Sequence, residues 1–206
     1  MKKVILSLVV FAAVLVSCKG KEEKKAAVKE VSTVEETVVS DSNINMETSV
    51  LFWKGFKPTG SHHGTVKLAS GTMAMVDGAI TGTFVIDMNT ITDADGLTKL
   101  DAHLKDADFF DVAKYATSKF VITSSEVKEG KMYVTGDLTI KDVTKSITIP
   151  ATVSEVEGVT IFKSEVFELN RVDFNVKYGS KSIFANLKDK FINDNMELSF
   201  EVQSVK

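Results

Sequence analysis

An apolar side chain at every second position marks the stretch Met196-Glu197-Leu198-Ser199-Phe200-Glu201-Val202-Gln203. Successive side chains of a β-strand point to opposite faces of a sheet, so this period of two predicts a strand with one buried face and one wet face. The same alternation recurs over residues 84–88 and 132–140. The chain is therefore predicted to be an all-β protein.

Eight strands are expected from this pattern, and turn signals separate several of them. Their approximate ranges are 48–57, 63–76, 79–89, 118–128, 131–140, 145–156, 159–170 and 196–205. Asp77-Gly78, Glu129-Gly130 and Glu157-Gly158 predict hairpin turns, because glycine readily adopts the positive φ that such turns need. Strands joined by short turns pair antiparallel. Eight such strands with one apolar face each close best into a barrel or a tight sandwich, and closure also removes exposed edges.

Two segments depart from the period of two. Residues 94–106 carry leucines three and four positions apart, which predicts one short helix between the third and fourth strands. These leucines are Leu97, Leu100 and Leu104, and the candidate caps are Asp93 and Asp95. A long loop, 171–195, precedes the last strand. Four aromatic residues argue against its being disordered, and they are Phe174, Tyr178, Phe184 and Phe191.

The composition limits the chemistry that the chain can perform. Its 206 residues allow one ordinary domain and a tail. Asp and Glu outnumber Lys and Arg by 28 to 25, which argues against nucleic acid as a partner. One cysteine excludes an internal disulfide framework and any multi-cysteine metal site. Three histidines and one arginine leave little material for acid–base or phosphate chemistry.

The first residues are typical of a targeting signal. Lys2 and Lys3 precede an apolar run over 4–16, which as a helix would be about 20 Å long and too short to cross a bilayer core of about 30 Å. Leu15-Val16-Ser17-Cys18 then resembles the lipobox of bacterial lipoproteins. That resemblance implies that Cys18 is lipidated and becomes the mature N-terminus. The alternative is an ordinary secretory signal with a chance cysteine.

Three regions follow from these observations: a signal peptide over 1–17, a lipidated tether over 18–45 and the barrel over 46–206. The tether is rich in charged and small residues and has no aromatic side chain, so burial cannot offset its chain entropy. We expect a membrane-anchored protein of the cell envelope, on the periplasmic face or at the cell surface.

Four motifs resemble the YceI-like family of lipocalin-like, polyisoprenoid-binding proteins. They span most of the predicted barrel in the family's order. The motifs are Gly60-Ser61-His62-His63-Gly64-Thr65-Val66, the central run from His103 to Tyr115 (HLKDADFFDVAKY), Thr135-Gly136-Asp137-Leu138-Thr139-Ile140 followed by Val143-Thr144-Lys145, and Arg171-Val172-Asp173-Phe174. The resemblance implies an eight-stranded barrel around a long tunnel. It also implies an isoprenoid ligand of the quinone or polyprenyl type, with no obligatory cofactor.

Inward-facing strand residues and loop aromatics are the candidates for lining such a tunnel. They are Phe84, Ile86, Met88, Phe109, Phe110, Leu138, Phe174, Phe200 and Val202. Each of them could instead be ordinary core, because small barrels are often filled by side chains. The sequence therefore leaves open whether the barrel is hollow or filled.

Arg171 and His62 are candidates for contacting a ligand's head group. Arginine suits a bidentate contact to carboxylate or phosphate, but we favour the alternative that Arg171 holds the long loop through an ion pair with a neighbour such as Asp173 or Asp108. Adjacent histidines on a strand point to opposite faces, so His62 and His63 predict no metal site.

We expect a binding protein rather than an enzyme. Two alternatives remain: a hydrolase or isomerase that uses His103 with nearby carboxylates, and a filled-barrel structural or stress protein of the envelope. Oligomeric state is not fixed by the sequence, and a homodimer is compatible with it.

Overall fold

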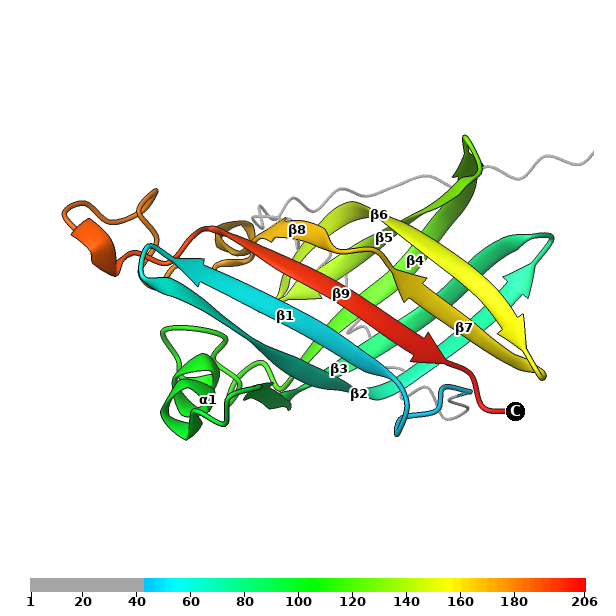
Figure 1. Ribbon diagram of the computed structural model, residues 1–206, viewed down its shortest axis with the longest axis horizontal. Coiled ribbons are helices and arrows are strands. Elements are labelled where there is room, and N and C mark those ends of the chain that lie inside the picture. The colour runs from blue at the N-terminus through cyan, green and yellow to red at the C-terminus, as the bar shows by residue number, and fades with distance from the viewer. Residues whose placement is uncertain (1–42) are drawn as a thin grey trace, which may run out of the picture. The chain divides into compact units, whose positions relative to one another are not determined.

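The computed structural model describes residues 43–206, so the predicted signal peptide, Cys18 and most of the predicted tether lie outside the described residues. The described part forms nine strands, one α-helix and two 3-10 helices (Figure 1). The strands are β1 (Val50–Lys57), β2 (Gly60–Val76), β3 (Ala79–Asp93), β4 (Thr117–Lys128), β5 (Lys131–Ile140), β6 (Val143–Val156), β7 (Val159–Ser164), β8 (Phe167–Asn170) and β9 (Asn195–Gln203). The helices are α1 (Thr98–Lys105), η1 (Arg171–Phe174) and η2 (Lys188–Lys190).

The sheet closes on itself. Strands β1 to β7 pair with their chain neighbours in antiparallel fashion, and β9 pairs with both β7 and β1. Leu51 on β1 lies opposite Phe200 on β9, so the alternating stretch that predicted the fold completes the barrel. The predicted all-β, eight-stranded antiparallel barrel with one short helix is confirmed.

Strands β7 and β8 both pair with β9 and together occupy the position of the seventh strand in the barrel. Phe162 of β7 lies opposite Val202, and Phe167 of β8 lies opposite Leu198, so the register slips by one residue between the two pairings. Ser164 fills the break, because its hydroxyl accepts a hydrogen bond of 3.0 Å from the backbone N–H of Phe200. The continuous strand predicted over 159–170 was therefore wrong at this bulge.

Helix α1 is shorter than the predicted helix over 94–106, and neither predicted cap precedes it directly. Leu97 is the N-cap residue, and no side chain caps the helix there. Asp93 instead ends β3 and organises the turn before α1, since its Oδ1 accepts hydrogen bonds from the N–H groups of Asp95 and Leu97. Within residues 43–206, no helix has the length and hydropathy needed to cross a membrane.

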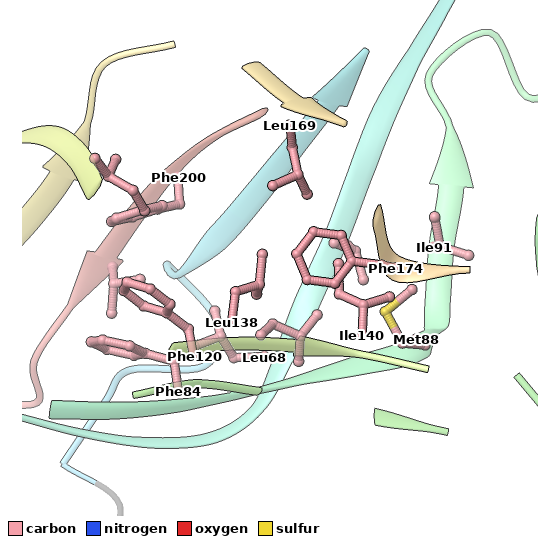
Figure 2. Close-up of a cluster of buried hydrophobic side chains, with 14 of the residues drawn as sticks. Leu68, Phe84, Met88, Ile91, Phe120, Leu138, Ile140, Leu169, Phe174 and Phe200 are labelled. Atoms are coloured by element: carbon pink, nitrogen blue, oxygen red, sulfur yellow. The ribbon is translucent and has the colours of Figure 1, made fainter. Parts of the chain in front are cut away.

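Aromatic side chains fill the barrel at the end away from α1. The ring of Phe162 lies 5.9 Å from that of Phe84 and 4.8 Å from that of Phe200, centroid to centroid, and Phe162 is fully buried. Figure 2 shows Phe84, Phe120 and Phe200 in this buried cluster, with Leu68 and Leu138 beside them. The aromatic plug, formed by Phe84, Phe162 and Phe200, stops the bore at this end.

The segment before β1 covers the same end of the barrel. The amide of Asn43 exchanges hydrogen bonds of 2.8 and 2.9 Å with the backbone of Met73, and the carbonyl of Asn43 accepts one from the N–H of Val205. Ile44 is buried and forms a bridge to Ser204. Asn43 and Ile44, which the sequence placed in the tether, therefore lie on the barrel.

Candidate functional site

A cavity of about 360 Å³ occupies the half of the barrel next to α1. Its walls come from six of the strands, from α1 and the segment that follows it, and from the region between β8 and β9, and most are apolar. Among the apolar lining residues are Leu51, Trp53, Val66, Ile86, Met88, Ile91, Leu104, Phe109, Phe110, Leu138, Ile140, Met196 and Leu198. At the outer end the lining includes the exposed residues Lys57, Tyr178 and Lys190, so the cavity reaches the surface there. We call this outer end the rim.

A smaller hollow of about 60 Å³ lies deeper in the barrel. Four apolar side chains line both hollows, namely Leu51, Ile86, Leu138 and Leu198. Beyond them stands the aromatic plug, of which Phe84 and Phe200 line the smaller hollow. The bore is thus open at the rim, its two hollows adjoin at these four residues, and it ends at the plug.

The structure brings eight of the nine predicted lining residues to these two hollows. Ile86, Met88, Phe109, Phe110 and Leu138 line the larger one, and Phe84, Phe200 and Val202 line the smaller one. Phe174 lines neither, because it is 1% exposed and belongs to the packed core labelled in Figure 2.

Arg171 is buried and serves as the centre of the long loop. Its guanidinium donates hydrogen bonds to three backbone carbonyls, from Nη1 to Val176 at 2.7 Å, from Nε to Asn193 at 2.9 Å and from Nη2 to Ile192 at 3.0 Å. Arg171 thus holds the two ends of the loop through these carbonyls and Asp194, rather than through Asp173 or Asp108. It also lines the cavity, and its contact with a ligand's head group stays a prediction. Burial lowers the pKa of the Arg171 guanidinium from its ordinary value.

The carboxylate of Asp194 lies 3.7 Å from the Arg171 guanidinium. Burial by itself would raise the pKa of Asp194. The nearby hydroxyls of Ser180 and Ser182, together with the charges of Arg171 and Lys181, outweigh burial and hold that pKa below its ordinary value. Asp194 is therefore ionised at neutral pH beside the buried arginine.

His62 lines the cavity on the β2 side, next to the end of β3. Its Nδ1 lies 3.6 Å from Oδ2 of Asp93, and both of these buried atoms lack a hydrogen-bond partner within the described part of the chain. Ligand atoms of His62, Asp93 and Asp95 lie within 4.8 Å of one another, an arrangement that could hold a cation. The sequence predicted no metal site and gave no sign of this group, because Asp93 comes from another strand. His63 is not part of it.

His103 stands at the rim on α1. Its ring meets Tyr178 edge-on at 4.5 Å between centroids, and its Nε2 lies 3.4 Å from Oδ2 of Asp108. Phe109 also packs against the His103 ring, at 5.8 Å. The aromatic contacts join α1 to the loop before β9 across the rim.

Several lining residues were not predicted from the sequence. Leu198 and Met196 share the alternation that selected Phe200 and Val202, so that signal was sufficient to find them. Tyr178, Lys190 and Ile192 come from an irregular loop, where no period predicts which side chain points inward.

The barrel closes through its first and last strands, has one helix beside its open end and contains an apolar bore, which together define a lipocalin-like barrel. Residues 37–204 match the model of the YceI-like domain. The chain belongs to the YceI-like family, as the four motifs predicted.

Curated relatives match part of the chain. A UPF0312 protein of Pseudomonas fluorescens is 40% identical over 93 residues, which are 44% of this chain and 48% of that protein. Protein YceI of Escherichia coli is 38% identical over 66 residues, or 32% of this chain and 35% of that protein. The chain thus spans about half or less of the length of these two relatives.

Two solved structures share the fold at low sequence identity. BcnA of Burkholderia cenocepacia superposes with a TM-score of 0.66 at 22% identity, covering 79% of this chain and 99% of BcnA. A polyisoprenoid binding domain from Saccharophagus degradans gives a TM-score of 0.59 at 14% identity, covering 81% of this chain and all of that domain. At these identities the likeness concerns the fold alone.

Proposed function

We propose that the barrel binds one isoprenoid or similarly amphipathic lipid, with its apolar tail in the 360 Å³ cavity and its head group at the rim. The observation that carries this proposal is the shape and lining of the bore, which is apolar, open at one end and stopped by aromatic rings at the other. The polyisoprenoid binding domain from Saccharophagus degradans has the same fold, which supports the choice of ligand class. The hollow also argues against the filled-barrel alternative.

The cavity volume sets the length of tail that can be enclosed. A cavity of about 150 Å³ in a protein core holds one benzene molecule, which is about 25 Å³ for each carbon atom. On that scale 360 Å³ encloses roughly 14 carbons, which is close to three five-carbon isoprene units. A longer quinone or polyprenyl tail must displace side chains at the plug or remain partly outside the rim.

The binding role that we propose needs no chemistry. The apolar walls supply affinity through burial, and the polar groups at the rim, including His62 and His103, are available to a head group. We further propose that the protein carries or stores this lipid while anchored to the cell envelope through lipidated Cys18. The Cys18→Ala variant should move from the membrane fraction to the soluble fraction. Unchanged partitioning would contradict the proposed anchor and would leave the proposal for the barrel unaffected.

Organic extraction followed by mass spectrometry tests the binding proposal. Leu138 lines both hollows, so the larger ring of Leu138→Trp should fill space where the two hollows meet. Val127→Trp adds the same ring at a residue that is 63% exposed and serves as the matched control. A prenyl lipid present in the unmodified protein and the control, but lost from Leu138→Trp, is the expected result. Equal lipid content in all three proteins would contradict the proposal.

A further inference from the structure

The loop between η1 and β9 differs in charge from the rest of the barrel. Residues 175–193 carry four lysines, Lys177, Lys181, Lys188 and Lys190, against one aspartate. Residues 43–206 as a whole carry 22 acidic and 18 basic side chains, so a loop of charge +3 stands on an acidic domain. All four lysines are exposed, and no ion pair involves them among the described residues.

The same loop exposes large apolar side chains. Ile183 is 45% exposed, Phe184 is 48% exposed and Tyr178 is 42% exposed. Lys181 lies over the ring of Phe191 at 4.7 Å, which places a cation beside the apolar tip. Soluble surfaces seldom keep such residues together without a partner. Alternation of lysine with aromatic and aliphatic residues is typical of segments that lie at a membrane interface.

The base of this loop is fixed while its tip projects. Arg171 binds the carbonyls of Val176, Ile192 and Asn193 at the two ends of the loop. The N–H of Ile192 also donates to the carbonyl of Gly179 at 2.8 Å. Because the base is fixed, the loop can present Ile183 and Phe184 at its tip without first becoming ordered. Figure 1 shows η2 at the same end of the barrel as α1, which is the end where the cavity opens.

We propose that residues 175–193 dock the rim of the cavity onto an anionic lipid bilayer. The lysines contact lipid phosphates, and Ile183 and Phe184 enter the interfacial layer. Tyr178 and Lys190 line the cavity as well as belonging to the loop, so docking places the opening against the membrane. The inference that lipid then passes between bilayer and cavity rests on the proposed function, whereas the docking itself does not.

A bilayer fits the loop better than a second copy of the chain does. A symmetric dimer through this loop would bring two segments of charge +3 together. The α1 side of the rim is acidic, because residues 93–111 carry six aspartates against two lysines, Lys99 and Lys105. That side should turn away from an anionic surface. The barrel should therefore approach the membrane at a tilt, with the basic loop over residues 175–193 nearest the bilayer.

Vesicle sedimentation tests the docking. The probe protein is residues 18–206 with Cys18→Ser, which lacks the acyl anchor, and the vesicles are phosphatidylcholine with or without phosphatidylglycerol. Each lysine near an anionic surface contributes about fivefold to partitioning. We expect Lys181→Glu/Lys188→Glu to lower binding to the anionic vesicles at least tenfold, and added salt to lower that of the unmodified protein. Lys119→Glu/Lys145→Glu, at two exposed lysines on the barrel wall, is the matched control and should change binding little.

The apolar tip has its own control. Ile183→Ser/Phe184→Ser should release the protein from anionic vesicles, whereas Val127→Ser/Val156→Ser, at two exposed hairpin residues, should not. Equal binding to neutral and anionic vesicles, or equal losses in loop and control variants, would overturn the proposal. So would a dimer in solution that the Ile183→Ser/Phe184→Ser change dissociates. Leu138→Trp separates the two proposals, because it should abolish lipid retention and keep vesicle binding.

Discussion

Nδ1 of His62 lies 3.6 Å from Oδ2 of Asp93, at the point where β2 and β3 pass beside the cavity. The other carboxylate oxygen of Asp93 accepts hydrogen bonds from the N–H groups of Asp95 and Leu97 and so shapes the turn that positions α1. One oxygen of Asp93 thus lies beside His62, which lines the cavity, and the other supports the turn before α1.

Two substitutions of Asp93 test the structural role of its Oδ1 contacts. Asp93→Ala leaves the N–H groups of Asp95 and Leu97 without their acceptor and should lower the free energy of unfolding by about 1–3 kcal/mol. Asp93→Asn keeps an acceptor oxygen for those groups and should cost less. Urea denaturation of both variants measures the difference. Equal losses would mean that the turn does not depend on the Oδ1 contacts.

The close approach of β2 to β3 depends on Gly64. A Cβ atom at this position would lie 1.8 Å from the carbonyl oxygen of Thr92, so the two strands would have to separate. We expect Gly64→Ala to destabilise the barrel strongly, by about 3 kcal/mol or more. Gly55 on β1 is the matched control, because a Cβ added there would meet nothing within 4 Å, and Gly55→Ala should have a small effect. Thermal unfolding of both variants checks this contrast.

The aromatic plug should set the depth of the bore. Phe200→Ala removes one ring of the plug and should cost about 3–5 kcal/mol of stability. If the variant folds, the volume left by the removed ring should join the smaller hollow that Phe200 lines. The barrel should then retain a longer prenyl tail than the unmodified protein does. Mass spectrometry of extracted lipid measures tail length, and an unchanged length distribution would argue against the plug as the stop.

The loop before β9 should depend on Arg171. Arg171→Ala leaves three carbonyls without their donor and Asp194 without its cation, so we expect a loss of about 3–5 kcal/mol. Arg171→Lys keeps the charge but cannot reach three carbonyls in fixed geometry, so it should rescue only part of the loss. Limited proteolysis should show faster cleavage within residues 175–193 in both variants. Full stability in Arg171→Lys would show that charge alone is sufficient.

Stability should depend on pH through Asp194. Its folded-state pKa lies below the ordinary value of 3.8, so the unfolded chain takes up a proton first as the pH falls. The ionised carboxylate therefore contributes stability that is complete above about pH 5 and is lost as the pH falls through the folded-state pKa. Asp194→Asn should be less stable than the unmodified protein at pH 7, and the gap should shrink below about pH 4. Urea midpoints over this range measure the gap.

Local periodicity was enough to predict most of the barrel, because a strand buried on one face must alternate. The same signal selected Phe84 and Phe200. It could not show that their rings meet Phe162 and stop the bore, since that contact joins strands distant in sequence. The bulge after Ser164 was missed for a related reason: the one-residue slip is visible only against the partner strand.

The polar part of the site was harder to predict than the apolar part. Arg171 was found as the single arginine, but its carbonyl partners lie up to 22 residues away in an irregular loop. Asp93 was expected to cap a helix, which is the local role of an aspartate before a leucine run. Its approach to His62 follows from strand pairing and has no signature in the sequence.

Asn43 joins the barrel beside Met73 and Val205, at the opposite pole from the opening. If Cys18 carries the proposed anchor, the 25 residues from Cys18 to Ser42 can reach at most about 85 Å. The 17 residues of β2, tilted as in other barrels, give a barrel height of about 43 Å. At full extension these residues would span about twice the barrel height. With the proposed anchor, that maximum reach would be enough for the opening to face either an apposed membrane or the membrane that carries the anchor. Removing half of residues 18–42 should then leave only the first orientation.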